Sequence, residues 1–252
     1  MAGHWRNPSP ARLGDGASLS PNTVLAQGAG LWNSGQLTVT HSSVFGNVSS
    51  YIGGGLADLG SSQAIISAAT FANNSATYGG GLINAGTGSG VIVSNSLFTH
   101  NRASYRGGAI DNEDILKVMT DTFAYNSALN GMGGGVANDG AFDSEIDSSA
   151  FFGNYANADG GAIYSASAHD LTFHALTLTN DSLSTNVAAT GGGVSHNGGT
   201  LTILNSTLNA NNAATGGNLA ASSGTLSLKN TIIASGSPTN CVGSITNGGH
   251  NL

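Results

Sequence analysis

A glycine-rich turn motif recurs along most of the chain and constrains the fold more than any other feature. Each copy ends in an aliphatic residue, and these residues are Leu31, Leu56, Leu82, Ile110, Val136, Ile163, Val194 and Leu219. Successive copies lie 25 to 31 residues apart. A second motif, Phe-x-x-Asn, follows about half a period later, as at Phe71 to Asn74. A repeat of this length is typical of a solenoid or an array of stacked units.

Short runs of alternating apolar and polar residues follow the turn motifs. We expect these runs to be strands with one face inward, because side chains along a strand alternate between its two faces. The runs lie at residues 37–39, 64–66, 91–93, 116–118, 144–146, 171–173, 201–203 and 226–228. A further inward position in each repeat holds Val44, Phe71, Phe98, Phe123, Phe151, Leu178, Leu208 and Ile233. The pattern predicts an all-β fold, a right-handed parallel β-helix (β-solenoid) of about eight turns with three short strands per turn.

The repeats divide the chain into three parts. Residues 1–27 hold three of the four prolines and are interpreted as an irregular N-terminal cap or an expression remnant. Residues 28–235 form the β-helix repeats, and residues 236–252 are interpreted as a closing segment that truncation could have shortened. The longest repeat contains an extended stretch from Asp181 to Thr190, which we expect to form a loop walling one side of a groove.

Polar residues recur at two fixed positions of the repeat. One column holds Asn47, Asn74, Asn101, Asn126, Asn154, Asp181 and Asn211, and the other holds Asn33, Asp58, Asn84, Asn112, Asn138, Ser165 and His196. Asparagine tolerates the left-handed backbone of tight turns, and stacked asparagines bond to one another along a ladder. We therefore assign both columns to the structure of the turns.

Composition excludes several classes of function. Charged residues make up 8% of the chain, the net charge is −7, and only six residues are Lys or Arg. Without a basic stripe to meet phosphates, we expect no nucleic-acid partner. No apolar run reaches the roughly 20 residues that span a bilayer, and the N-terminus lacks the apolar core of a signal peptide. Cys241 is the only cysteine, so no internal disulfide forms.

The pairing of Gly-Gly-Ala-Ile, at 107–110 and 160–163, with Phe-x-x-Asn resembles the repeats of chlamydial polymorphic outer-membrane proteins. It is also similar to other bacterial secreted right-handed β-helix proteins. Residues 240–252 look like the end of such domains, in which a second cysteine commonly follows the position of Cys241. The resemblance implies an extracellular or bacterial cell-surface protein, often an adhesin.

One ionisable cluster interrupts the outward face of the predicted middle strands. Its members, on three consecutive turns about 4.8 Å apart, are Lys117, Glu145, Asp147 and His174. An acidic pair beside a histidine and a lysine suits sugar binding or acid/base catalysis. These would be the catalytic residues if the chain is an enzyme. The alternative interpretation is solvated cross-strand ion pairs worth a few tenths of a kcal/mol each.

Two other groups are weaker candidates. An aromatic and basic patch that could bind a glycan or a partner protein comprises His100, Arg102, Tyr105, Arg106 and Tyr125. An acidic turn comprises Asp111, Glu113 and Asp114, but it lacks the spacing of a full Ca²⁺ loop. The histidines show no zinc-ligand spacing. We therefore expect no metal site and no cofactor.

These observations favour a non-catalytic extracellular scaffold or adhesion module that binds glycans or surface-protein partners. The alternative is a polysaccharide lyase or glycoside hydrolase of pectin-lyase-like fold, since the same fold hosts many functions. Ice binding is disfavoured because the outward threonine column is broken by Ile, Lys, Met, Glu and Asp residues. Unpaired strand edges at the ends of the solenoid predict end-to-end self-association.

Overall fold

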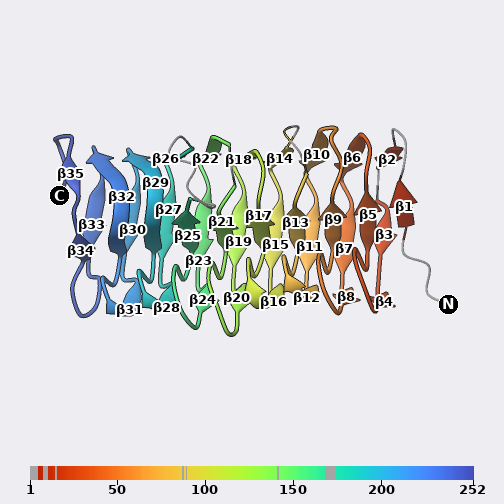
Figure 1. The fold of residues 1–252 in the computed structure, drawn as a ribbon, viewed down its shortest axis with the longest axis horizontal. Coiled ribbons are helices and arrows are strands. Elements are labelled where there is room, and N and C mark those ends of the chain that lie inside the picture. The colour runs from red at the N-terminus through yellow and green to blue at the C-terminus, as the bar shows by residue number, and fades with distance from the viewer. Residues whose placement is uncertain are drawn as a thin grey trace.

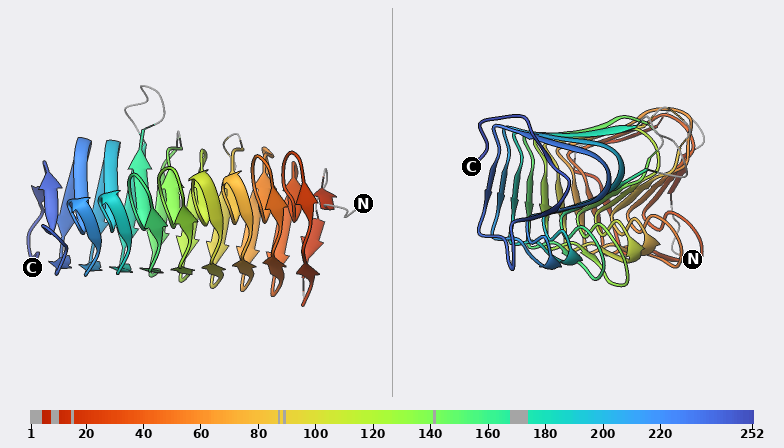
Figure 2. Two further views of the ribbon diagram at one scale, coloured as in Figure 1. Left: turned by 90° about the horizontal axis from the view of Figure 1, so that it is seen from below. Right: turned by 60° about the vertical axis from the view of Figure 1, so that its left-hand side comes forward.

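Strands of successive turns pair in parallel and stack into one rod (Figure 1). The computed structural model describes residues 5–7, 11–14, 16–86, 88, 90–140, 142–167 and 174–252. The secondary structure of these residues consists of strands and turns, without a helix. The first described strands, in red, and the last strands, in blue, lie at opposite ends of the rod (Figure 2). The predicted parallel β-helix is confirmed.

Sheet 1 is the largest and takes two strands from most turns. Its first column consists of β1 (Trp5–Asn7), β5 (Leu31–Asn33), β9 (Leu56–Asp58), β13 (Leu82–Asn84), β17 (Ile110–Asn112), β21 (Val136–Asn138), β25 (Ile163–Ala166) and β34 (Cys241–Gly243). Its second column consists of β2 (Ala11–Leu13), β6 (Leu37–Thr40), β10 (Ala64–Ser67), β14 (Val91–Ser94), β18 (Leu116–Met119), β22 (Ser144–Asp147), β26 (Ala175–Thr179) and β35 (Thr246–Asn247). The long strands β29 (Val194–Leu204) and β32 (Leu219–Lys229) span both columns.

Two narrower sheets complete each turn. Sheet 2 consists of β3 (Ser18–Leu19), β7 (Ser43–Phe45), β11 (Thr70–Ala72), β15 (Leu97–Thr99), β19 (Thr122–Ala124), β23 (Ala150–Phe152), β27 (Ser182–Ser184), β30 (Thr207–Asn209) and β33 (Ile232–Ala234). Sheet 3 consists of β4 (Thr23–Val24), β8 (Val48–Ser49), β12 (Ser75–Tyr78), β16 (Arg102–Arg106), β20 (Ser127–Ala128), β24 (Tyr155–Ala156), β28 (Val187–Thr190) and β31 (Asn212–Thr215).

Both terminal segments belong to the stack. Strands β1 to β4 pair in parallel with β5 to β8 of the next turn, so the described part of residues 1–27 forms a turn instead of an irregular cap. This extra turn explains why sheet 2 has nine strands although the sequence predicted about eight turns. At the other end, β34 and β35 both pair with β32 and continue the solenoid.

The repeat between Ile163 and Val194 differs from the prediction. Strand β26 pairs Leu176 and Leu178 with Ser144 and Ile146, so the expected third-strand position of Leu178 is wrong. Leu183 stacks on Phe151 in its place. The stretch 181–190 is not an extended loop, because it contains β27 and β28. The strand expected at 171–173 lies outside the described residues.

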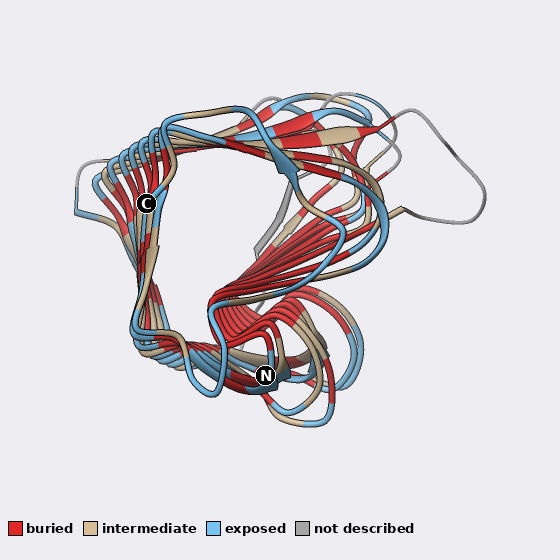
Figure 3. Cartoon of the chain, turned by 90° about the vertical axis from the view of Figure 1, so that its left-hand side faces the viewer, coloured by how far each residue is buried: buried red, intermediate tan, exposed pale blue. Residues whose placement is uncertain are grey.

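Stacked apolar side chains fill the interior of the solenoid. Buried residues recur at matching places on successive turns (Figure 3). The aliphatic residues that end the turn motifs, such as Leu56 and Ile110, are fully buried. The phenylalanines of sheet 2 form a parallel stack, in which the ring centroids of Phe71 and Phe98 lie 4.8 Å apart and those of Phe123 and Phe151 lie 4.5 Å apart. Offset ring stacking adds to the free energy gained by burying this apolar area.

The glycines of the turn motif are explained by the corner between sheets 3 and 1. Gly53 has φ +60, a left-handed conformation that glycine adopts without a steric penalty. Gly54 has no room for a side chain, because a Cβ atom there would clash with the carbonyl oxygen of Gly80 in the next turn. The motif is therefore a structural corner.

An asparagine ladder runs along the interior corner after sheet 2. Each side-chain amide donates to the amide oxygen of the next turn at 2.9–3.0 Å. Its members are Asn47, Asn74, Asn101, Asn126, Asn154, Asn186 and Asn211. Asn186, and not the predicted Asp181, continues the ladder. Each amide thus has partners for its hydrogens and oxygen, as burial requires.

Replacing one rung of this ladder leaves several buried groups without partners. In an Asn126→Ala variant, the backbone and side-chain N–H groups of Asn101 lose their acceptor, and the carbonyl oxygen of Phe98 loses a donor. We predict that urea unfolding shows a loss of roughly 3 kcal/mol or more in unfolding free energy. The exposed Asn209 on sheet 2 provides the control, and Asn209→Ala should change stability by less than about 0.5 kcal/mol.

A second column of polar residues contains one carboxyl group. Asp58 is buried and accepts a hydrogen bond from Asn33 Nδ2 at 2.7 Å. Burial raises the pKa of Asp58 from 3.8 to about 6. One turn further on, the buried Asn84 Oδ1 has no donor among the described residues. An ionised Asp58 offers no hydrogen to this neighbour, whereas an asparagine would.

We predict that Asp58→Asn stabilises the protein by on the order of 1 kcal/mol at pH 7. Because the pKa of Asp58 is higher in the folded state, the folded protein binds this proton more tightly than the unfolded chain. The contribution is fully present below about pH 4 and is lost as pH rises through about 6. The gain from the substitution should therefore shrink when melting temperatures are compared at pH 7 and pH 4. A gain of equal size at both values would contradict this assignment.

Candidate functional site

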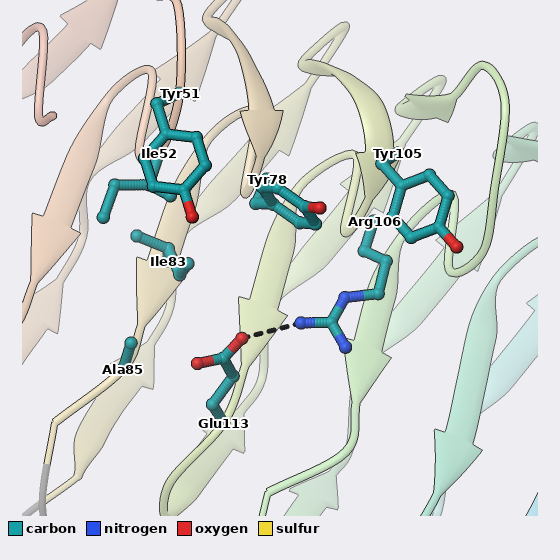
Figure 4. Close-up of a pocket in the computed structure, with 8 residues that line it drawn as sticks. All are labelled: Tyr51, Ile52, Tyr78, Ile83, Ala85, Tyr105, Arg106 and Glu113. Atoms are coloured by element: carbon teal, nitrogen blue, oxygen red, sulfur yellow. Dashed lines mark hydrogen bonds and ion pairs between the residues drawn. The ribbon is translucent and has the colours of Figure 1, made fainter. Parts of the chain in front are cut away.

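A hollow of about 390 Å³ lies on the outside of the rod between sheet 3 and the first column of sheet 1. The residues around it are Tyr51, Ile52, Tyr78, Ile83, Ala85, Tyr105, Arg106 and Glu113 (Figure 4). They come from three consecutive turns. The hollow falls within the size range of pockets for small ligands, and its lining is largely apolar with a few polar groups, as such pockets usually are.

Strand alternation places the floor of the hollow. In β13, Leu82 and Asn84 belong to inward columns, so the middle residue Ile83 faces outward. The same position on the next turn holds Asp111. Along the rim of sheet 3, Ile52, Tyr78 and Arg106 pair in register. Ile52 and Ile83 are nearly fully buried and pack with Tyr78, so this part of the outer surface has a small apolar core of its own.

Three tyrosines form a row along one wall of the hollow. The ring centroids of Tyr51 and Tyr78 lie 5.8 Å apart, and those of Tyr78 and Tyr105 lie 5.7 Å apart. The rings meet edge to face, a favoured aromatic geometry. Tyr51 and Tyr105 are 53% and 42% exposed, so both rings remain open to a ligand.

Arg106 closes one end of the hollow. Its Nη2 lies 2.7 Å from Glu113 Oε1 and 3.5 Å from Asp111 Oδ2, and its Nη1 pairs with Asp139. Its guanidinium carbon also lies 5.6 Å from the ring centroid of Tyr78, within cation–π distance. The side chain thus links the rim of sheet 3 to two carboxylates, Glu113 and Asp139, that follow strands in the first column of sheet 1.

Asp111 lies at the centre of this cluster and is fully buried. Burial raises its pKa to about 8, and nearby Asp139 and Glu113 add to the rise, although Arg106 opposes it. Burial also raises the pKa of Asp139. The cluster is therefore held together by one guanidinium among three carboxyl groups.

We predict that Arg106→Met lowers the free energy of unfolding by about 3 kcal/mol, because it leaves buried carboxyl groups without their counter-ion. Lys117→Met is the matched control. The Lys117–Glu145 pair, 3.7 Å long, is about half exposed on both sides, so its loss should cost less than about 0.5 kcal/mol. Equal losses in the two variants, measured by urea unfolding at low salt, would contradict this account of the cluster.

The predicted cluster of Lys117, Glu145, Asp147 and His174 does not assemble. Lys117 and Glu145 pair as expected, beside a small hollow of about 180 Å³. His174 is buried, with Nε2 2.8 Å from the carbonyl oxygen of Ala166. Its predicted place is wrong because β26 begins after it, and Thr177 and Thr179 occupy the positions beside Glu145 and Asp147. The Oδ1 of Asp147 instead accepts from Asn180 Nδ2 at 3.0 Å.

The predicted aromatic and basic patch separates into different surfaces. Tyr105 and Arg106 line the hollow. The rings of His100 and Tyr125 lie 5.3 Å apart at a tilt on the turn that follows sheet 2, and Arg102 is exposed on sheet 3. The patch therefore does not form one site.

The acidic turn also divides. Asp111 and Glu113 reach Arg106, whereas the Oδ2 of Asp114 accepts from the backbone N–H of Gly88 at 2.8 Å. Among the described residues, no group of three or more His, Cys, Asp or Glu side chains is arranged to hold a metal ion.

The tyrosine row was missed by sequence reasoning, although a signal was present. Successive tyrosines of the row are 27 residues apart in the sequence, at Tyr51, Tyr78 and Tyr105. Each stands one or two residues before the glycine turn of its repeat. Regular spacing of exposed aromatic residues next to a corner is not needed for the core. Asp139 was missed as well, because it lies 33 residues from Arg106 in the sequence. The contact joins sheet 3, which holds Arg106, to the end of a strand of sheet 1.

Comparisons with known proteins find no matching family model, no matching curated protein and no matching solved structure. Within the described residues, no helix has the length and apolar character needed to cross a membrane. The function must therefore be inferred from the geometry of the chain itself.

Proposed function

We propose that this protein is a non-catalytic β-helical module that binds a glycan in the hollow beside the tyrosine row. The observation that carries the proposal is the row itself, with centroid spacings of 5.8 and 5.7 Å along a hollow of about 390 Å³. Amphipathic aromatic rings present an apolar face to a ligand and a polar tip to water. Sugars need both, because their rings carry apolar C–H faces and hydroxyl edges.

The polar groups of the hollow suit recognition of hydroxyl groups. Glu113 supplies acceptors and is 44% exposed, while Arg106 supplies donors next to it. Ile52, Ile83 and Ala85 provide the apolar surface opposite these groups. A few polar groups in a largely apolar pocket fix the orientation of a ligand.

The arrangement argues against catalysis in this hollow. Hydrolysis of a glycosidic bond requires two carboxyl groups on either side of that bond. Asp111 is fully buried beneath Arg106, and the other two carboxylates of the cluster also pair with this guanidinium. An extracellular or cell-surface location accompanies the proposal, because polysaccharides are abundant there and the sequence resemblance implies it.

We predict that a panel of neutral and charged polysaccharides, tested by affinity electrophoresis, contains at least one ligand and shows no cleavage products. Tyr78→Ala and Tyr51→Ala should each weaken that binding by about fivefold or more, since a lost stacking contact removes about 1 kcal/mol or more. Tyr155→Ala is the matched control, because Tyr155 is a similarly exposed tyrosine of sheet 3 outside the hollow. Binding that survives both substitutions in the tyrosine row would refute the proposed site.

A further inference from the structure

The charges around the hollow do not cancel. Glu113, Asp111 and Asp139 share the single guanidinium of Arg106, which leaves a formal excess of two negative charges. With the Asp111 carboxyl protonated at neutral pH, as its pKa of about 8 implies, one negative charge remains in excess. Arg106 is the only basic residue among those that line the hollow in the described structure. A positively charged group would therefore be attracted to this end of the hollow.

Two carboxyl oxygens of the cluster are buried without a partner. Within the described residues, neither Asp111 Oδ1 nor Asp139 Oδ1 makes a hydrogen bond. Asp111 is the middle residue of β17, between the inward-facing Ile110 and Asn112, so strand alternation directs its side chain toward the outer floor. Buried acceptors without donors cost about 1–3 kcal/mol each. Neither aspartate is among the residues that line the hollow, so these carboxyl groups act on a ligand there through the electrostatic field and not by direct contact.

The tyrosine row provides a second attraction for positive charge. The face of an aromatic ring carries negative potential, and a cation within about 6 Å of the ring centroid is stabilised by it. Arg106 already uses the ring of Tyr78 in this way, at 5.6 Å. Tyr51 and Tyr105, on either side of Tyr78, are exposed, and the Glu113 carboxylate lies across the hollow from this row (Figure 4).

We propose that the hollow selects a glycan built of amino sugars, and that it holds one ammonium group between the Glu113 carboxylate and the tyrosine row. This inference rests on the proposed glycan binding and adds the charge class of the sugar. An ammonium group offers three donors and a positive charge. An N-acetylated sugar lacks that charge, and a uronic acid brings a carboxylate that Glu113 and Asp139 would repel.

Isothermal titration with three oligosaccharides of equal length tests the proposal directly. The probes are oligomers of glucosamine, N-acetylglucosamine and galacturonic acid, in low salt at slightly acidic pH. We expect the glucosamine oligomer to bind about tenfold or more tightly than its N-acetylated counterpart, the size of one charge-assisted hydrogen bond. The galacturonic acid oligomer should show no measurable binding.

Charge-neutralising substitutions locate the effect. Glu113→Gln keeps an oxygen that can accept from Arg106 but removes the negative charge, so it should reduce the ratio of glucosamine affinity to N-acetylglucosamine affinity. An unchanged urea unfolding midpoint reports that the variant is folded. Asp139→Asn should reduce the preference in the same direction. Glu145→Gln alters an exposed carboxylate outside the hollow and should leave the preference intact.

The outcomes separate this inference from the proposed function. Equal affinity for the two glucosamine-based oligomers, or tighter binding of galacturonic acid, would overturn the amino-sugar inference while glycan binding stands. A preference that persists in both Glu113→Gln and Asp139→Asn would overturn the placement of the ammonium group. No binding of any of the three probes also overturns the inference, and the broader polysaccharide panel then decides on the proposed function by itself.

Discussion

Stacking of like side chains on successive turns is the interaction on which the rest of this structure depends. A single turn of three short strands cannot bury its own apolar residues, so each turn is stable only between neighbours. The Phe71–Phe98 stack and the Asn101–Asn126 bonds show how apolar and polar residues meet this condition together. Because each side-chain amide of the ladder bonds to the next, the fold explains the repeated asparagines, and the corner geometry explains the repeated glycines.

The ionisable groups with shifted pKa values discussed above lie at positions where one residue differs from the other residues of its stacked column. Asp58 stands in an asparagine column, and its burial raises its pKa to about 6. Asp111 stands in an outward column that otherwise holds Ile83 and Ala137 on the adjacent turns. The departure at Asp111 lies on the outward side of the sheet, where Arg106 can reach across columns to balance the charge. The tyrosine row adds an apolar wall beside this charged group.

The regular part of the fold could be predicted from the sequence because its signals are local and repeated. The glycine corner, the phenylalanine stack and most of the asparagine ladder all follow from residues at a fixed period. The prediction failed between Ile163 and Val194, where Leu178 was expected in the third strand of its turn, whereas Leu176 and Leu178 lie in β26 and pair with β22. The expected outward position of His174 depended on a strand at 171–173, whereas β26 begins at Ala175 and His174 is buried.

The candidate site was only partly predictable, for a different physical reason. The sequence marks two separate local groups, one with Tyr105 and Arg106 and one with Asp111 and Glu113. Whether the two groups come into contact depends on the distance between the rim of sheet 3 and the edge of sheet 1. That distance is set by the shape of each turn and not by the period. The ion pair of Arg106 with Asp139 crosses between turns and columns, so no local pattern reports it.

A crystal structure of the protein with a glucosamine oligomer would test the central claim most directly. The account predicts sugar rings packed along Tyr51, Tyr78 and Tyr105, with an ammonium nitrogen within hydrogen-bond distance of Glu113. An oligomer bound on the outer face of sheet 2, or over the Lys117–Glu145 pair with the tyrosine hollow unoccupied, would contradict it.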